Sequence, residues 1–125
     1  MKQTPPSHDP TQQRAAVPSF MGRVSPVLDT CTQLCLLDPK GHGAVACWTM
    51  PVHGASLYQR VLEIQQLKIG LIICGAVSER FETLLRAAEV RLIPGIAGDL
   101  DEVIAAYCNG TLNDPRFRMP GSDGS

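Results

Sequence analysis

The sequence lacks several features that would place it in a functional class at once. No apolar run approaches the roughly 18 residues that a membrane-spanning helix needs, and the longest, IGLIICGAV at residues 69–77, is about half of that. Eleven basic residues against twelve acidic residues leave a net charge of −1. Such a balance provides neither the basic surface of a nucleic-acid-binding protein nor a polybasic membrane anchor. We therefore expect neither nucleic acid nor a membrane among the partners.

Common catalytic signatures are also missing. The chain has no G-x-S-x-G or H-E-x-x-H motif, no convincing cysteine–histidine nucleophile pair and no paired carboxylates. We therefore expect a protein that is not an enzyme. The amino-terminal residues 1–14 lack the apolar segment of a secretory signal, which predicts a cytoplasmic protein. Its five cysteines would then be reduced, and their odd number argues against a closed disulfide framework.

The length of 125 residues suits one domain with its own core. Residues 1–13 are rich in Pro, Gln and Thr and have almost no large apolar side chains, so they predict a disordered tail. Residues 14–112 form the predicted domain. Residues 113–125 form a carboxyl-terminal extension, in which Phe117 and Met119 are apolar enough to pack back onto the domain.

Hydrophobic periodicity changes along the domain. The first half has short apolar segments typical of strands, and the turn PKGHG predicts that the second and third of them pair as an antiparallel hairpin. In the second half, helical spacing alternates with apolar strands. Ser56 and Ser78 are predicted helix N-caps, and Gly110 is a predicted helix end. The predicted strands cover residues 15–20, 33–38, 44–52, 69–77 and 90–97, and the predicted helices cover residues 56–68, 79–89 and 100–110.

This order of elements predicts an α/β fold. Strands that alternate with helices are joined by parallel crossovers, whereas the hairpin adds antiparallel strands to the same sheet. We expect a mixed sheet of about five strands with an N-terminal antiparallel hairpin and with helices packed on the sheet.

The cysteines and histidines offer weak metal-site candidates. Cys31 and Cys35 form a single C-x3-C pair, whereas strong metal motifs contain two such pairs or a pair with spaced histidines. Cys31 lies at a loop-to-strand junction and could be a soft ligand for an iron–sulfur species. Cys35 lies within a predicted strand, where a core position is the alternative. His53 precedes a helix and could face a ligand there, or it could be an ordinary polar loop residue.

The segment CGAVS, residues 74–78, joins a central strand to a helix. Ligands of open α/β sheets gather at the carboxyl ends of strands, and the backbone N–H groups that follow Gly75, with Ser78 among them, could bind an anion. The segment is not a Walker or dinucleotide-binding motif. An ordinary strand-to-helix turn is the alternative.

Three blocks of the sequence together resemble a known family. They are VPSFMGRVSPVLDTCTQLCLLD at residues 17–38, the long block LKIGLIICGAVSERFETLLRAAEVRLIPGIAGDLDEVIAAYCNGTL at residues 67–112, and DPRFRMPG at residues 114–121. From Arg14 to Gly121 the chain resembles the dinitrogenase iron–molybdenum cofactor biosynthesis family, the nitrogenase accessory factor-like domain. The last block is similar to a bacterial subgroup with the motif RMPG.

The resemblance implies a ribonuclease H-like fold. It also implies a non-catalytic role in binding or carrying an iron–sulfur or iron–molybdenum cofactor, or its precursor. Two positions depart from the family pattern. Cofactor-carrying members have His-Phe-Gly after the Val-Ser of the first loop, whereas Val27 and Leu28 stand in place of the histidine and phenylalanine. Members of the RMPG subgroup often have a cysteine after that motif, whereas this chain has Ser122.

Two functions therefore compete. In the first, the chain binds or carries a cofactor at the loop Gly22–Cys31, with Arg23 as the cationic contact. A metal-free protein-interaction or regulatory domain is the second, and it would use a sheet edge or the segment RFRMPG as its contact. A sensor of anions or nucleotides at CGAVS is a third option. The cofactor-binding candidates are Arg23, Ser25, Cys31, Gly75 and Ser78, and the metal-ligand candidates are Cys31, Cys35 and His53.

Overall fold

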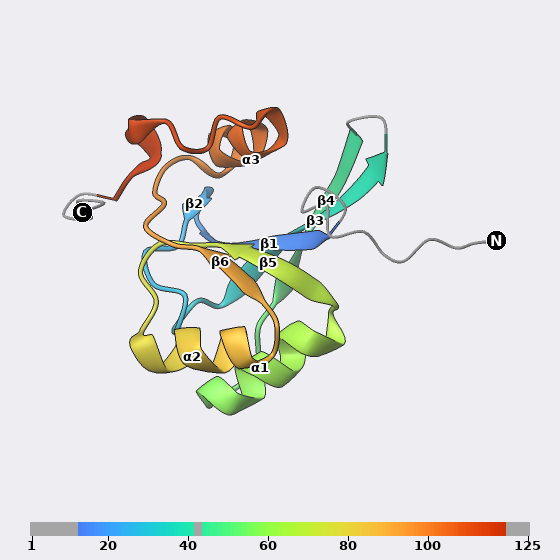
Figure 1. Cartoon of the computed structure of the whole chain (residues 1–125), viewed down its shortest axis with the longest axis vertical. Helices are drawn as coiled ribbons and strands as arrows, with labels where there is room; N and C mark the ends of the chain where they lie inside the picture. Colours follow the sequence, from blue (N-terminus) through green and yellow to red (C-terminus); the bar gives the residue numbers. More distant parts are fainter. Residues whose placement is uncertain (1–12, 42–43, 120–125) are drawn as a thin grey trace.

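An open mixed sheet forms the centre of the structure (Figure 1). The structure is a computed structural model that describes residues 13–41 and 44–119. The main path of the sheet has the strand order β4-β3-β1-β5-β6, and the sixth strand, β2, pairs with β1. The strands are β1 (Arg14–Phe20), β2 (Arg23–Val24), β3 (Gln33–Gly41), β4 (Ala44–Pro51), β5 (Ile69–Ile73) and β6 (Arg91–Ile93).

Strand pairing confirms the predicted mixture of directions. Strand β3 pairs antiparallel with both β1 and β4, whereas β5 pairs parallel with β1 and β6. The predicted hairpin is therefore formed by β3 and β4. The sheet has six strands rather than about five because β2 spans only two residues, too few to show a strand period.

Three helices follow the positions that the periodicity predicted: α1 (Leu57–Gln66), α2 (Glu79–Ala87) and α3 (Leu100–Asn109). The side chain of Ser56 accepts a hydrogen bond from the backbone N–H of Gln59 in a complete capping box. The side chain of Ser78 caps α2 by accepting a hydrogen bond from the backbone N–H of Phe81. Gly110 ends α3 with a φ of 76°, a left-handed conformation that glycine adopts without steric cost.

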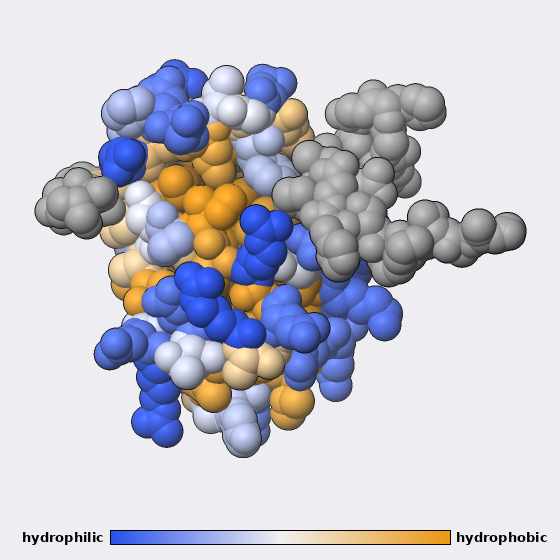
Figure 2. Space-filling model, in the orientation of Figure 1, coloured by the Kyte–Doolittle hydropathy of each residue, from blue (hydrophilic) through white to orange (hydrophobic). Residues whose placement is uncertain are grey.

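The two faces of the sheet carry separate apolar clusters. Ala16, Leu36 and Ile72 belong to the cluster that α1 and α2 cover. Their strand neighbours Val17 and Leu37 belong to the cluster that α3 covers. Successive strand residues point to opposite faces, so both clusters come from the same strands. Figure 2 shows apolar residues in the middle of the molecule, between α3 and α2, where the sheet lies.

The segment that follows α3 packs back against the domain. A short 3-10 helix (Pro115–Phe117) places the Phe117 ring in the cluster beneath α3, where the side chain is almost fully buried. The backbone N–H of Met119 donates to the carbonyl oxygen of Gly95 at 2.9 Å. This segment is part of the folded unit.

Some predictions lie outside the described residues. They include residues 1–12 of the predicted tail, and Ser122 with the rest of residues 120–125. Within residues 13–41 and 44–119, no helix has both the length and the apolar character that crossing a bilayer requires.

Candidate functional site

Three loops meet at the end of the sheet where β1, β5 and β6 finish. We call them the loop face: residues 20–29, residues 74–78 and residues 94–99. Backbone hydrogen bonds join the loops in sequence. The N–H of Ala76 donates to the carbonyl oxygen of Pro26 at 2.8 Å, and the N–H of Gly95 donates to the carbonyl oxygen of Gly75 at 3.0 Å. A third bond of 3.0 Å runs from the N–H of Val24 to the carbonyl oxygen of Gly98. The loops therefore form one connected surface.

Gly75 allows the first two loops to approach each other closely. A Cβ atom at this position would lie 2.6 Å from the carbonyl oxygen of Pro26 and 3.1 Å from that of Ser25. Both obstacles are backbone atoms, which cannot rotate away as a side chain can. Gly75 was a predicted binding residue, and the structure gives it this packing role between the loops.

Asp29 occupies the amino-terminal end of α2. Its Oδ1 accepts a hydrogen bond of 2.8 Å from the backbone N–H of Ser78. The N–H of Ala76 is also engaged, by Pro26. Two of the amides that follow Gly75, which were predicted to bind an external anion, therefore already have partners within the chain.

Arg23 and Ser25 differ in their exposure. Arg23 lies on β2 with an exposed side chain, and its guanidinium forms no ion pair with another described residue. Ser25 is buried, and its N–H donates to the carbonyl oxygen of Pro18 at 2.8 Å, so it holds the loop in place. Beside Arg23, the tip of the β1–β2 turn exposes Phe20 and Met21, whose side chains are 57% and 84% accessible. The exposed part of the loop face thus combines Arg23 with three apolar side chains, Phe20, Met21 and Val27, and with the exposed Asp99, which lies opposite Arg23 in an isolated β-bridge.

Cys31 lies beneath the first loop rather than on its surface. Its side chain is only 5% exposed, in the apolar cluster covered by α1 and α2. Arg60 Nη1 donates to the Cys31 carbonyl oxygen at 2.6 Å and lies 3.9 Å from its Sγ. Burial raises the pKa of the Cys31 thiol, and the Arg60 guanidinium opposes that shift only in part. Cys74 is buried in the same cluster, and desolvation raises the pKa of its thiol to about 12.

The three predicted metal ligands do not meet. Cys35 belongs to the apolar cluster on the opposite face of the sheet from Cys31, and burial raises the pKa of its thiol to about 11. His53 is exposed between β4 and α1, where its backbone N–H donates to Glu63 Oε2 at 2.9 Å. Among the described residues, no three His, Cys, Asp or Glu side chains are placed to hold a metal ion. A thiolate ligand must be deprotonated, so a cluster ligated by these thiols does not fit this structure.

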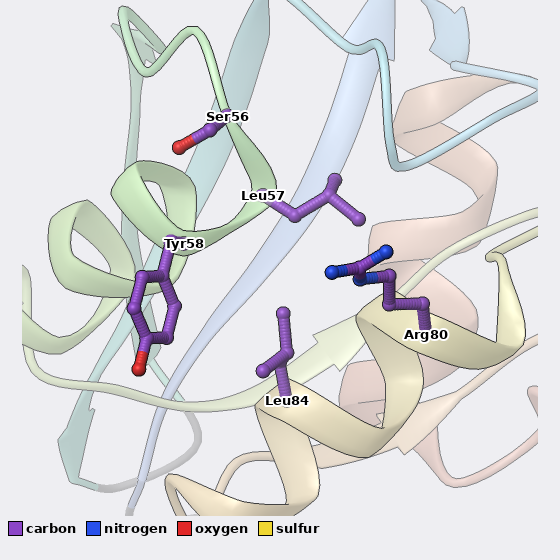
Figure 3. A pocket seen from close by; sticks show the side chains of 5 residues that line it. All are labelled: Ser56, Leu57, Tyr58, Arg80 and Leu84. Atoms are coloured by element: carbon purple, nitrogen blue, oxygen red, sulfur yellow. The ribbon is translucent and has the colours of Figure 1, made fainter.

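A separate groove of about 630 Å³ lies between α1 and α2 (Figure 3). Leu57 and Leu84 face each other across it, and the Arg80 guanidinium extends beside them. Ser56 and Tyr58 complete the lining. None of the predicted site residues lies in this groove.

Two relevant contacts escaped sequence reasoning. The sequence places Asp29 in the first loop and Arg60 on a predicted helix, and neither position by itself indicates a partner. The pairing of Asp29 with Ser78 joins residues 49 positions apart, and that of Arg60 with Cys31 joins residues 29 positions apart. A short-range motif cannot reveal contacts of this kind. Helix N-termini do favour carboxylates, which is the one general signal that pointed toward Asp29.

Comparison with known proteins identifies solved structures that have the same fold. No family model matches the chain, and no curated protein matches its sequence. Several solved structures do match. PH0822 superposes with a TM-score of 0.71 at 17% identity, over 78% of this chain and 89% of its own. The orange protein of Desulfovibrio gigas, in its apo form, superposes with a TM-score of 0.65 at 16% identity, over 80% of this chain and 90% of its own. A Methanocaldococcus jannaschii protein, provisionally described as a dinitrogenase, superposes with a TM-score of 0.64 at 15% identity, over 80% of this chain and 91% of its own.

The chain has the fold of these proteins. A Thermotoga protein provisionally described as a NifB protein shares it, with a TM-score of 0.57 at 23% identity, over 79% of this chain and 90% of that one. The resemblance seen in the sequence and the likeness in structure thus point to the same dinitrogenase- and NifB-related fold. Identities this low establish the fold alone, so the role of this chain has to be argued from its own residues.

Proposed function

We propose that the chain is a non-enzymatic accessory protein that binds or carries an anionic iron–sulfur or iron–molybdenum type cofactor, or its precursor, on the loop face. One observation carries this proposal. Three hydrogen-bonded loops at the carboxyl ends of parallel strands present an exposed Arg23, which forms no ion pair with another described residue, beside the exposed Phe20 and Met21. The carboxyl ends of strands are where open α/β sheets bind their ligands.

The proposed contact is non-covalent. Cys31 is buried and holds its proton, and Val27 stands where the resemblance leads us to expect a histidine. In this proposal the charge of Arg23 and its apolar neighbours hold the cofactor, and no cysteine sulfur or histidine nitrogen is bonded to the metal. A cationic side chain attracts an anionic cluster, and the neighbouring apolar side chains exclude water and so strengthen that attraction. The cluster is cargo in this proposal, and the chain performs no chemical step on it.

Support for the cargo comes from the resemblance to the dinitrogenase cofactor biosynthesis family and from the names of the structural neighbours. A ribonuclease H-like assignment and membership of the RMPG subgroup remain predictions of that resemblance. Cytoplasmic location is likewise part of the proposal.

Anaerobic loading tests the proposal. The full chain is incubated with ferrous iron and sulfide, or with tetrathiomolybdate, and desalted, and its visible absorption is recorded. We expect retained absorption that Arg23→Gln lowers several-fold. Lys68→Gln is the matched control, because it removes one positive charge at the amino end of β5, the opposite end of the strands. We expect this control to retain as much absorption as the wild type.

Cys31→Ala separates non-covalent binding from ligation by sulfur. Retained absorption in this variant supports the non-covalent site. Its loss would show that sulfur ligates the metal and would contradict our account of the contact. Absence of any retained absorption in the wild type, with both probes, would overturn the proposal as a whole.

The alternative is a metal-free protein-interaction domain of the same fold. The groove between α1 and α2 favours it, because that groove offers apolar walls and the Arg80 guanidinium without any metal ligand. Loading experiments distinguish the two functions, since this domain would retain neither probe. The third option, a sensor of anions at CGAVS, loses support because Asp29 already holds the Ser78 amide.

A further inference from the structure

Strand β4 is an uncovered edge of the sheet. It stands last in the strand order, so among the described residues only β3 pairs with it. Its residues Cys47, Trp48 and Thr49 are all exposed, although neighbouring residues of a strand point to opposite faces. No described helix therefore covers either face of this part of β4, and no described strand other than β3 pairs with it. Figure 1 shows the β3–β4 hairpin reaching beyond the helices.

The strand register identifies the groups that are open on this edge. Val52 lies opposite Thr32 and donates its N–H to the Thr32 carbonyl oxygen at 3.0 Å. Hydrogen-bonded pairs alternate along an antiparallel ladder, so Met50, Trp48 and Ala46 direct their backbone groups toward β3. The backbone N–H and carbonyl groups of Val45, Cys47 and Thr49 then point outward. These three residues form a row of donors and acceptors without partners in the sheet.

No charge protects this edge. Residues 44–52 (AVACWTMPV) contain no Asp, Glu, Lys or Arg. Exposed edge strands usually contain lysine, proline, an inward-pointing charge or a bulge that prevents pairing with another chain. In β4 the proline, Pro51, is the last residue, and the irregularity of the β3–β4 pairing lies near the turn, between Pro39 and Gly41, so the segment from Val45 to Thr49 contains neither device. The other end of the sheet order shows the contrast, because β6 is only three residues long and begins with the exposed Arg91.

We propose that β4 pairs with β4 of a second copy of this chain, antiparallel about a two-fold axis, so that two sheets become one. Two-fold pairing places each residue opposite a residue of the same strand, so a charged strand would bring like charges together. The uncharged β4 avoids that repulsion. An antiparallel edge is also complementary to itself, because its donors and acceptors alternate along the strand.

One register pairs all three of these residues. With the axis at Cys47, each Cys47 forms a hydrogen-bonded pair with the partner's Cys47, and Val45 of each chain pairs with the partner's Thr49. Hydrogen-bonded antiparallel pairs have Cα atoms about 5.5 Å apart, within the roughly 4.4–6.8 Å that a disulfide spans. The two exposed Cys47 thiols are therefore placed to be cross-linked.

Sedimentation and cross-linking of the full chain test this dimer. We expect a reversible dimer with a dissociation constant in the micromolar range, because a single strand pair is a small interface. Addition of diamide should convert the dimer into a covalent one: a bond forms between two Cys47 sulfur atoms, and the diamide takes up the two electrons and two protons. Cys47→Ser should abolish the cross-link. Cys108→Ser, which removes the other exposed thiol, should leave it unchanged.

A charge on the edge provides the second test. Cys47→Lys places two lysines opposite each other and should weaken the dimer at least tenfold. Thr83→Lys adds the same charge on the exposed face of α2 and should leave the dimer unchanged. A chain that stays monomeric at millimolar concentration, a cross-link through Cys108, or a dimer that survives Cys47→Lys would each overturn the proposal. The dimer does not depend on cofactor binding, so its failure would leave the retention of absorption by the loop face untouched.

Discussion

The Asp29 carboxylate and the Ser78 backbone N–H are joined by a hydrogen bond of 2.8 Å. This bond ties the first loop to the first turn of α2, where the helix dipole favours a negative charge. Ser78 also caps α2 with its own side chain, through the N–H of Phe81 at 3.1 Å. The start of α2 is thus held by one local contact and by one contact from a distant loop.

Removal of the Asp29 carboxylate should destabilise the fold. We expect Asp29→Ala to lower the free energy of unfolding by about 1 kcal/mol, the usual cost of losing a side-chain acceptor at a helix N-terminus. Asp29→Asn keeps an oxygen acceptor without the charge, so its loss should be about half as large. Urea denaturation measures both values. Equal stability of Asp29→Ala and the wild type would show that the bond is weak in solution.

Gly75 should tolerate no side chain. Gly75→Ala would place a Cβ atom 2.6 Å from the Pro26 carbonyl oxygen, so the first two loops would have to separate. We expect the free energy of unfolding to fall by about 2–3 kcal/mol, as in other cases of overpacking. Gly22→Ala is the comparison, because Gly22 has a φ of +78° but no atom within 4 Å of the added Cβ. Its cost should be about 1 kcal/mol, from backbone conformation alone.

The comparison of these two glycines separates two physical causes. Gly75 is not at a positive φ, so urea denaturation of Gly75→Ala gives the steric cost, and that of Gly22→Ala gives the conformational cost. A larger loss for Gly22→Ala than for Gly75→Ala would contradict the close approach of the loops.

The order of the elements was predictable because their periods are local. Leu57, Val61 and Ile64 repeat at helical spacing, and Ile69–Ile73 is an uninterrupted apolar strand. The site was harder to predict, because its contacts join distant segments. The spacing of Cys31 and Cys35 suggested a pair, yet Cys35 lies within β3, where the pleat directs its side chain to the face under α3. The spacing of two cysteines does not determine which face of the sheet each side chain reaches. For this reason, a metal site cannot be predicted from two cysteines alone.

Phe117 should be a main anchor of the carboxyl-terminal segment. Its ring is buried with Val103 and Ala106 of α3. We expect Phe117→Ala to lower the free energy of unfolding by about 3 kcal/mol, because the ring leaves a cavity. The neighbouring Arg116 is exposed. Its Cζ lies 4.7 Å from the centre of the Phe117 ring, and its Nε lies 3.9 Å from Asp114 Oδ2. Arg116→Ala should therefore cost less than about 1 kcal/mol.

Truncation after Leu112 extends the same test. The shortened chain keeps all three helices and all six strands but loses Phe117 and the bond from Met119 to Gly95. We expect a lower midpoint of thermal unfolding, by at least as much as for Phe117→Ala. An unchanged midpoint would show that residues 113–125 are dispensable for folding, in contrast to their packing.

The buried thiol of Cys74 should make the protein less stable at high pH. Burial raises the pKa of this thiol to about 12 from its ordinary value of 9.0. Cys31 once it is ionised, and the negative charges of Glu82 and Asp29, act in the same direction. Between pH 9 and pH 12 the unfolded chain releases the thiol proton, whereas the folded chain keeps it. The unfolded state then binds fewer protons, so the free energy of unfolding falls as the pH rises through this window.

Cys74→Ala isolates this contribution. The variant should be less stable than the wild type at pH 7, because it leaves a small cavity, but its stability should fall less steeply above pH 9. The difference in slope cannot exceed about 1.4 kcal/mol per pH unit, the value for one proton. Urea denaturation at steps from pH 7 to pH 10.5 measures both slopes. Parallel curves for the two proteins would show that Cys74 ionises in the folded chain as easily as in the unfolded chain, and that it is not desolvated.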